Sequence, residues 1–173
     1  MSSQKGVTLI ELMIGIGMLA ILVAIAVPNY QLLVKNNRLT SASNELLGVF
    51  QVARAEAVRS NRRVVLMLEP APVATNNEGH VMVFVDADRD SVQDAGERQV
   101  RTFLLPAGTL TLTAVSGIEG SETAVDRISF QPDGRTLGSA NMTVSVCDDR
   151  GKGKALSLLG SGQARLTGDI TCS

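Results

Sequence analysis

The longest apolar stretch of the chain lies near its N-terminus. After a short polar start, residues 7–27 are apolar apart from Thr8, Glu11 and two glycines. About 20 residues of helix cross the hydrocarbon core of a bilayer. Lys5 precedes the run and the next basic residue is Lys35. The positive-inside rule therefore predicts a single membrane-spanning helix, with the N-terminus in the cytoplasm and the remainder outside.

A second helical pattern follows Pro28, a residue that removes one hydrogen bond from a helix and tends to kink it. Apolar residues then recur at steps of three and four, while charged residues fall largely between them. This spacing predicts an amphipathic continuation of the helix over residues 28–61, with one face packed on the chain's own head. The positions expected on that face are Leu39, Ala42, Leu46, Val49, Phe50, Ala53 and Ala57.

From Arg63 the pattern changes to short apolar or alternating runs rich in Val, Leu and Thr, separated by Pro, Gly and Asn. Such runs are typical of strands joined by turns. We predict an α+β fold in which a long N-terminal helix packs on a mostly antiparallel sheet, with the β-rich head over residues 62–173. The predicted strands are Val64–Leu68, Val81–Asp86, Gln99–Leu105, Thr109–Val115, Ile128–Gln131, Met142–Cys147 and Ala155–Leu159. Residues 117–126 are expected to form a loop.

Composition adds little beyond this picture. The chain has 173 residues, a formal net charge of −1, 3% aromatic residues and no tryptophan, which suits one domain with an aliphatic core. The sequence has no G-x-S-x-G elbow, no H-E-x-x-H and no P-loop, and His80 is its only histidine. We therefore expect no enzymatic activity and no organic cofactor.

Two cysteines, Cys147 and Cys172, lie near the C-terminus, too few and too widely spaced for a zinc site. From the residues alone they form either two free thiols or one disulfide, depending on the compartment.

Three readings compete for the N-terminal segment. A conventional signal peptide would be cut after Ala26, where Ala24-Ile25-Ala26 supplies the small residues, and would release a soluble periplasmic binding module. A plain membrane anchor is the second reading. Glu11 favours the third, a prepilin leader, because a carboxylate near the start of a spanning helix is costly and usually has a functional partner.

The stretch Lys5-Gly6-Val7-Thr8-Leu9-Ile10-Glu11-Leu12 resembles the processing site of type IV prepilins, although Val7 stands where the family usually has Phe. The resemblance implies a leader over residues 1–6, peptidase cleavage after Gly6 and N-methylation of Val7. It also implies that Glu11 pairs with the new amine, its own or a neighbour's, and sets the register of filament assembly.

Three segments of the head are similar to the type II secretion protein H/FimT/FimU group of pilin-like proteins: residues 83–97, 130–134 and 146–153. This resemblance implies a minor pilin that initiates type IV pilus assembly at the filament tip, or a minor pseudopilin H of the type II secretion system. Other pilins or pseudopilins, the prepilin peptidase and an inner-membrane assembly platform are the implied partners. The implied location is the inner membrane with a periplasmic head, where Cys147 and Cys172 are expected to form a disulfide.

An acidic stretch has the spacing of a calcium-binding loop. Oxygen ligands at positions 1, 3, 5, 7, 9 and 12 of such a loop wrap one hard cation. Position seven is Val92, which would contribute its carbonyl, and position six is Ser91 instead of the usual glycine. The carboxylates at the remaining positions are Asp86, Asp88, Asp90, Asp94 and Glu97. The alternative is a solvated hairpin loop, neutralised in part by Arg89 and Arg98.

DNA binding is a further hypothesis. Some FimT-type minor pilins bind DNA through a Gly-Arg-x-Arg motif, and the matching stretch here, Gly162 to Arg165, has only one arginine. Lys152 and Lys154 are nearby in sequence and would have to supply the missing phosphate contacts. The alternative is a solvated basic turn.

Overall fold

The computed structural model describes residues 8–69, 80–105, 110–116, 123–138 and 141–172. Its only helix in these ranges, α1 (Leu9–Ser60), runs without interruption for 52 residues. The chain divides into two units, residues 1–38 and 39–173, which are described separately. The predicted start Val7 and the leader residue Gly6 lie outside the described residues.

The first unit consists of the N-terminal part of α1. Every side chain from Leu9 to Leu33 is exposed, and an 18-residue window within the helix has a mean hydropathy of 2.6, apolar enough to cross a membrane. Pro28 lies inside the helix, as predicted from its position. The side-chain amide of Asn29 donates to the carbonyl oxygen of Ile25 at 3.1 Å, next to the hydrogen bond that proline cannot make. A kink at Pro28 stays a prediction.

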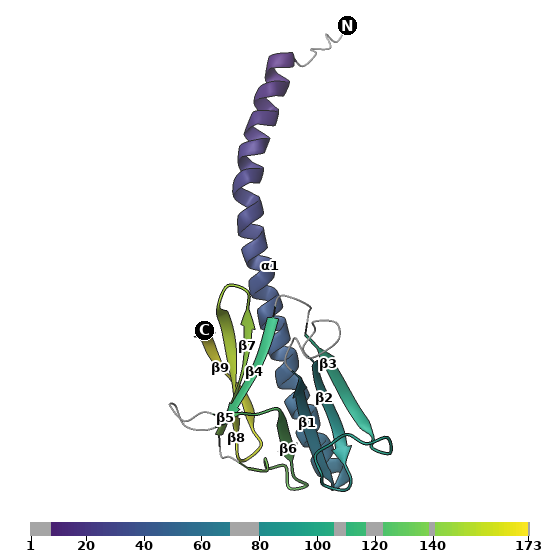
Figure 1. The fold of residues 1–173 in the computed structure, drawn as a ribbon. Helices are drawn as coiled ribbons and strands as arrows, with labels where there is room; N and C mark the ends of the chain where they lie inside the picture. Colours follow the sequence, from purple (N-terminus) through teal and green to yellow (C-terminus); the bar gives the residue numbers. More distant parts are fainter. Residues whose placement is uncertain (1–7, 70–79, 106–109, 117–122, 139–140, 173) are drawn as a thin grey trace. The chain divides into compact units, whose positions relative to one another are not determined.

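The second unit combines the C-terminal part of α1 with two antiparallel sheets (Figure 1). One sheet has the strand order β3-β2-β1-β6 and the other the order β5-β4-β7-β8-β9. The first contains β1 (Arg63–Glu69), β2 (His80–Asp86), β3 (Gln99–Leu104) and β6 (Arg127–Phe130). The second contains β4 (Leu110–Ser116), β5 (Thr123–Ala124), β7 (Asn141–Asp148), β8 (Lys152–Leu159) and β9 (Ala164–Thr171).

The chain crosses between the sheets and thereby ties them together. It leaves the first sheet after β3, returns to it as β6 beside β1, and ends in the second sheet. At the crossing, the Leu68 N–H donates to the Asp126 carbonyl at 2.7 Å, and the Val125 N–H donates to the Ala114 carbonyl at 2.9 Å. The antiparallel arrangement is therefore confirmed, and its strands are divided between two sheets.

One aliphatic core joins the helix to both sheets. All seven helix positions predicted from the spacing are buried, and Leu46 and Val49 are fully so. They share a hydrophobic cluster with residues of both sheets such as Leu66 and Val144. Burying a side chain of this size contributes about 1.5–3 kcal/mol, so helix packing is a major stabilising term of this unit.

Seven of the nine strands overlap the predicted ones. The exceptions are β5, which lies in the stretch expected to be a loop, and β9, which was not predicted. Most side chains of β9 are exposed and its pairing with β8 shifts register between Ala155 and Leu156, opposite Gly168. An exposed edge strand with an internal glycine lacks the apolar alternation that identifies a strand.

Candidate functional site

The start of α1 places Glu11 in a defined backbone setting. The Glu11 N–H donates to Thr8 Oγ1 at 3.3 Å and the Leu12 N–H donates to the Thr8 carbonyl at 3.2 Å, so Thr8 caps the helix. Thr8-x-x-Glu11 has the spacing of a capping box, and Glu11 is an acidic residue in the first turn. Glu11 therefore has a local structural role in addition to the one inferred from the resemblance.

The residues that follow form an apolar surface that no part of the described chain covers. Large side chains such as Leu12, Ile21 and Leu32 are about half to two thirds exposed. An uncovered apolar surface of this extent marks contact with a membrane or with other protein chains.

The head is closed by a disulfide between Cys147 on β7 and Cys172, just after β9. The expected pairing is thus confirmed, and it links the first and third strands of the order β7-β8-β9. The bridge passes over Gly153 of β8, where an added Cβ would lie 2.5 Å from Cys172 Sγ and 2.7 Å from the Val146 carbonyl oxygen. Only glycine leaves enough room for the bridge at this point.

The β7–β8 turn next to the bridge is organised by Asp148. Its Oδ1 accepts hydrogen bonds from the Arg150 N–H at 2.9 Å and the Lys152 N–H at 3.0 Å, and its Oδ2 accepts one from Arg150 Nε at 2.8 Å. Burial alone would raise the pKa of Asp148, but these hydrogen bonds and the charge of Arg150 outweigh it and lower the pKa.

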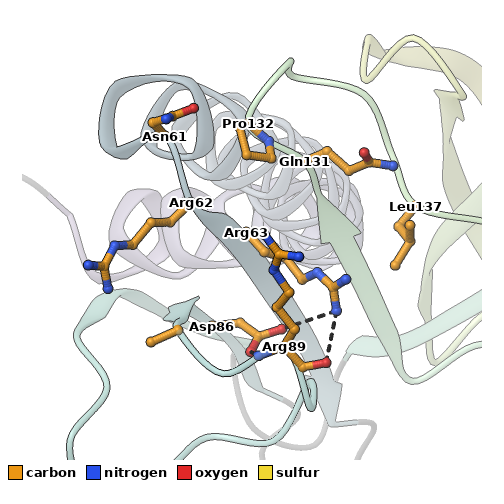
Figure 2. Close-up of a pocket in the computed structure, with 9 residues that line it drawn as sticks. Asn61, Arg62, Arg63, Asp86, Arg89, Gln131, Pro132 and Leu137 are labelled. Carbon is orange, nitrogen blue, oxygen red and sulfur yellow. Dashed lines mark hydrogen bonds and ion pairs between the residues drawn. The ribbon is translucent and has the colours of Figure 1, made fainter.

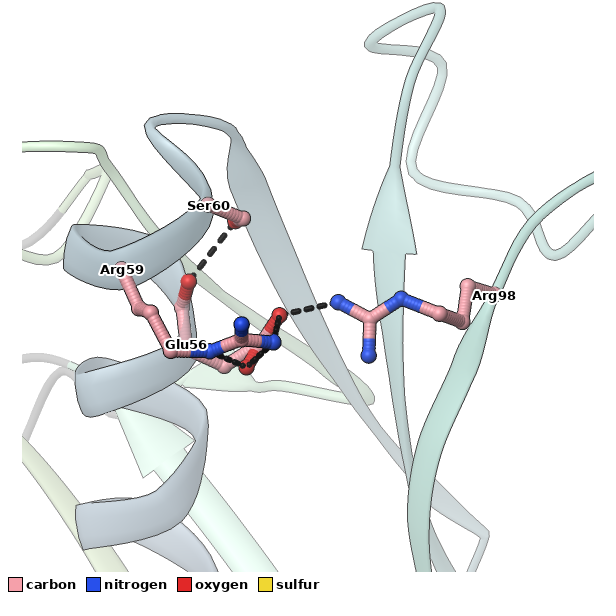
Figure 3. Close-up of polar contacts among 4 residues, drawn as sticks. All are labelled: Glu56, Arg59, Ser60 and Arg98. Carbon is pink, nitrogen blue, oxygen red and sulfur yellow. Dashed lines mark hydrogen bonds and ion pairs between the residues drawn. The ribbon is translucent and has the colours of Figure 1, made fainter.

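A buried carboxylate on the helix ties α1 to the first sheet (Figure 3). Glu56 is 7% exposed, accepts two hydrogen bonds of 2.9 Å from Arg59, and is also bonded by Arg98, which lies one residue before β3. Burial would raise the pKa of Glu56, but the hydrogen bonds from Arg98 and then Arg59 outweigh it and lower the pKa. The sequence analysis did not identify Glu56. Its position on the buried face of α1, between Ala53 and Ala57, is the feature that could have indicated it.

The acidic stretch connects β2 and β3, so its flanks are strands, as predicted. Carboxylate oxygens approach one another to within 4.8 Å in two sets, Asp86/Asp88/Glu97 and Asp88/Asp90/Asp94. At the start of the loop, Arg63 Nη1 lies 3.5 Å from Asp86 Oδ2 and donates to the Arg89 carbonyl at 3.1 Å (Figure 2). These residues also line a pocket of about 350 Å³ with Asn61, Arg62, Gln131 and Leu137.

The residues considered for DNA are not brought together by the fold. On the β8–β9 hairpin, Arg165 pairs with Ser157 of β8. Ser157 is five residues farther along β8 than Lys152, so Arg165 and Lys152 lie about 17 Å apart along the strands. Lys154 Nζ forms an ion pair with Asp169 Oδ1 at 2.6 Å. Arg165 instead lines a groove with Gln51, Arg54 and Gln163.

Gly162 of the same stretch has a structural explanation. It has φ +78°, a left-handed conformation that favours glycine, and an added Cβ would lie 1.9 Å from the Gly134 carbonyl oxygen. Arg54 Nε donates to that carbonyl at 3.0 Å. The β8–β9 turn, the turn at Gly134 and the helix therefore meet at this point.

An apolar N-terminal helix with a capped acidic first turn, continued into a helix packed on antiparallel sheets, defines a pilin-like protein. Comparisons with known proteins agree. Residues 1–27 match the prokaryotic N-terminal methylation motif, and residues 42–163 match the family of type II transport protein GspH. The chain therefore belongs to the GspH family, and its N-terminus fits a pilin anchored in the inner membrane.

Relatives and solved structures fall in the same class. A fimbrial protein of Pseudomonas aeruginosa is 31% identical over 127 residues, which cover 73% of this chain and 81% of the relative. The type IV minor pilin FimU of Pseudomonas aeruginosa superposes with a TM-score of 0.59 at 23% identity, covering 80% of this chain and 97% of FimU. The minor pseudopilin EpsH of Vibrio cholerae gives a TM-score of 0.52 at 13% identity, over 75% and 95% of the two chains. Both likenesses concern the fold.

Proposed function

We propose that the chain is a minor pilin of type IV pili that works by assembling with other pilin-like subunits, and that catalysis has no part in its role. The observation that carries the proposal is the uncovered apolar surface of α1 with Glu11 in its first turn. Cleavage after Gly6 by a prepilin peptidase removes Lys5, which otherwise holds the segment at the cytoplasmic face. The helix then leaves the bilayer, helped by the inner-membrane platform, and packs beside the helices of neighbouring subunits.

Glu11 has two tasks in this proposal. Its position at the third residue of the capped helix offsets the positive end of the helix. Its charge also pairs with the amine of methylated Val7, in the same subunit or in a neighbour, which reduces the desolvation cost of both charges inside a filament. The head remains in the periplasm, where the compartment is oxidising and the bridge between Cys147 and Cys172 persists.

The mature N-terminus tests the first step. Intact-mass measurement and N-terminal sequencing of the full chain, expressed with a prepilin peptidase, should give a chain that begins at N-methyl-Val7. A chain that begins at Val27 would instead identify a soluble periplasmic protein and contradict the proposal.

Three variants then separate the two tasks of Glu11. Glu11→Ala removes charge and cap, Glu11→Gln keeps a residue suited to a capping box but removes the charge, and Thr8→Ala keeps the charge but removes the cap. We expect both Glu11 variants to insert into the membrane but to be absent from sheared filaments, while Thr8→Ala is incorporated. Normal incorporation of Glu11→Gln would contradict the role of the charge.

Two alternative functions lead to different outcomes. A pseudopilin H of the type II secretion system shares the same helix and head, so the filament that captures the full chain decides between them. For DNA uptake, Arg165 lies apart from Lys152 and Lys154, which weakens a joint phosphate contact.

A further inference from the structure

Negative charge is concentrated in the connection between β2 and β3. Asp86 ends β2, Gln99 begins β3, and the twelve residues from Asp86 to Glu97 include five carboxylates. Asp88 belongs to both sets of oxygens that approach to within 4.8 Å, so the five groups form one continuous cluster. Like charges this close repel one another, and the repulsion opposes the folded loop.

The arginines beside the loop form a direct ion pair with only one of its five carboxylates in the described residues. Arg98 turns to Glu56 on the helix, and Arg63 approaches only Asp86. Within the described parts of the chain, the guanidinium of Arg89 has no ion pair, and neither do the other four carboxylates of the loop, Asp88, Asp90, Asp94 and Glu97. The alternative of a solvated hairpin loop neutralised in part by Arg89 and Arg98 therefore has no direct ion pair with a loop carboxylate to support it in the described residues.

Asp86 provides a second observation, which is independent of the spacing of the carboxylates. Its side chain is fully buried, and its Oδ1 accepts the Arg89 N–H at 2.7 Å. Its Oδ2 forms an ion pair with Arg63 Nη1 at 3.5 Å but accepts no hydrogen bond within the described residues. A buried carboxylate oxygen left without a hydrogen bond is costly, and Asp86 is one of the three groups in the first set of approaching oxygens.

We propose that residues 86–97 bind one calcium ion. The ligand set contains only oxygen: five carboxylates and the Val92 carbonyl stand at the positions from which a loop wraps a hard cation. Glu97, at position twelve, also accepts the Ala87 N–H at 2.7 Å and so draws the two ends of the loop together. Magnesium fits less well, because it demands a small octahedral site and gives up its water reluctantly.

Ser91, at position six, is compatible with this role. It has φ +64°, the left-handed conformation for which glycine is normally selected at this position. The serine adopts the required turn, so the sequence departure that counted against calcium does not prevent the loop from closing. We expect an affinity of roughly 10⁻⁴–10⁻³ M, the range of extracellular calcium modules.

The test uses the full chain in detergent, freed of metal with EDTA and measured by calorimetric titration and thermal unfolding. At a calcium concentration ten times the dissociation constant, the ratio of folded to unfolded protein should rise about elevenfold. Magnesium at the same concentration, and sodium chloride at the same ionic strength, should each produce a much smaller rise. Glu97→Gln and Asp90→Asn should each lower the calcium affinity at least tenfold, whereas the control Asp126→Asn, an exposed carboxylate outside the loop, should not.

Each outcome decides the proposal. No binding heat and no change in melting temperature at millimolar calcium would overturn it. A shift of equal size with magnesium or sodium chloride would show charge screening alone and would also overturn it. Glu97 accepts the Ala87 N–H with one oxygen and the Asp94 N–H with the other, and the single amide oxygen of glutamine cannot replace both. If Glu97→Gln fails to fold for this reason, the exposed Asp90→Asn decides alone, and an undiminished calcium affinity in that variant is the overturning result.

Discussion

Gly153→Ala tests the account of the disulfide most directly, because the new methyl group would occupy the space under the bridge. Its Cβ would lie 2.5 Å from Cys172 Sγ, 3.1 Å from Cys147 Sγ and 2.7 Å from the Val146 carbonyl oxygen. Ordinary contacts are about 3.5–4.0 Å between carbon atoms, so these groups must move by about 1 Å or the bridge must fail to form.

Two limits bound the loss of folding stability in Gly153→Ala. If the bridge forms, the crowding costs about 1–3 kcal/mol, as for other overpacked interiors. If it does not form, the chain loses the constraint on a 25-residue separation, worth about 3.5 kcal/mol in the chain-entropy model. Because the protein adopts the less costly state, we expect a loss of about 1–3 kcal/mol and a fall in melting temperature of about 3–5 °C for each kcal/mol.

The assay is thermal unfolding of the full chain, with free thiols counted by alkylation and mass. In a Cys147→Ser/Cys172→Ser background the cost of Gly153→Ala should shrink, since both sulfur contacts are absent, but not vanish, since Val146 remains. Gly48→Ala is the matched control, because nothing lies within 4 Å of its added Cβ and an alanine stabilises a helix interior by about 0.5–1 kcal/mol. A Gly153→Ala protein as stable as wild type with its bridge intact would refute the reasoning.

Two further substitutions test the contacts that join α1 to the sheets. Glu56→Gln should lower stability by about 1–3 kcal/mol at pH 7, measured by urea unfolding, because charged hydrogen bonds to Arg98 and Arg59 are lost. Folding lowers the pKa of Glu56, so its contribution to the free energy of unfolding is present at neutral pH. That contribution is lost as the pH falls below the ordinary value of 4.5 and through the lowered pKa of the folded state. An undiminished difference in stability between wild type and variant at pH 3 would contradict this account. Gly162→Ala should lower the free energy of unfolding by more than about 2 kcal/mol, because its Cβ would overlap the Gly134 carbonyl. The control Gly96→Ala meets no atom within 4 Å and should change stability little. Equal melting temperatures for the two variants would exclude the packing role of Gly162.

The helix and its buried face were predictable because they depend on local spacing. Periodicity of 3.6 residues gave every apolar position of α1 that the fold buries, from Leu39 to Ala57. The polar residues on the same face were not predictable in this way. Glu56 is buried only because Arg98, 42 residues later in the chain, returns beside the helix, and no local pattern contains that information.

The strands show the same limit. Strands that bury one face carry alternating apolar residues and were found, whereas β9 is exposed along most of its length and is held by pairing with β8 and by the nearby bridge. The division into two sheets depends on β6 pairing with β1 across some 60 residues of chain. Such nonlocal pairing is a property of the whole fold, so the sequence pattern indicated strands but not their order.

The acidic loop shows how a structure changes the weight of a motif. From the sequence, the carboxylates had an alternative explanation as a solvated hairpin loop that Arg89 and Arg98 neutralise in part. The fold assigns Arg98 to Glu56, and it leaves Asp86 Oδ2 buried without a hydrogen bond. The spacing is unchanged, but the competing explanation lacks a direct ion pair from Arg89 or Arg98 to a loop carboxylate in the described residues.

For the stretch from Gly162 to Arg165, the structure weakens the support that the motif gives to DNA binding. Its resemblance to a DNA-binding motif rests on one glycine and one arginine, and the glycine is required by the close approach of Gly134 whether or not the protein meets DNA. Gly162 therefore carries no information about DNA, and its substitution would disturb the turn and the groove together. Only Arg165, which is exposed and whose loss leaves the turn intact, can distinguish a DNA-binding surface from a structural turn. A binding assay on this head is informative when it compares wild type with Arg165→Ala at matched stability, because any other change in the stretch confounds recognition with folding.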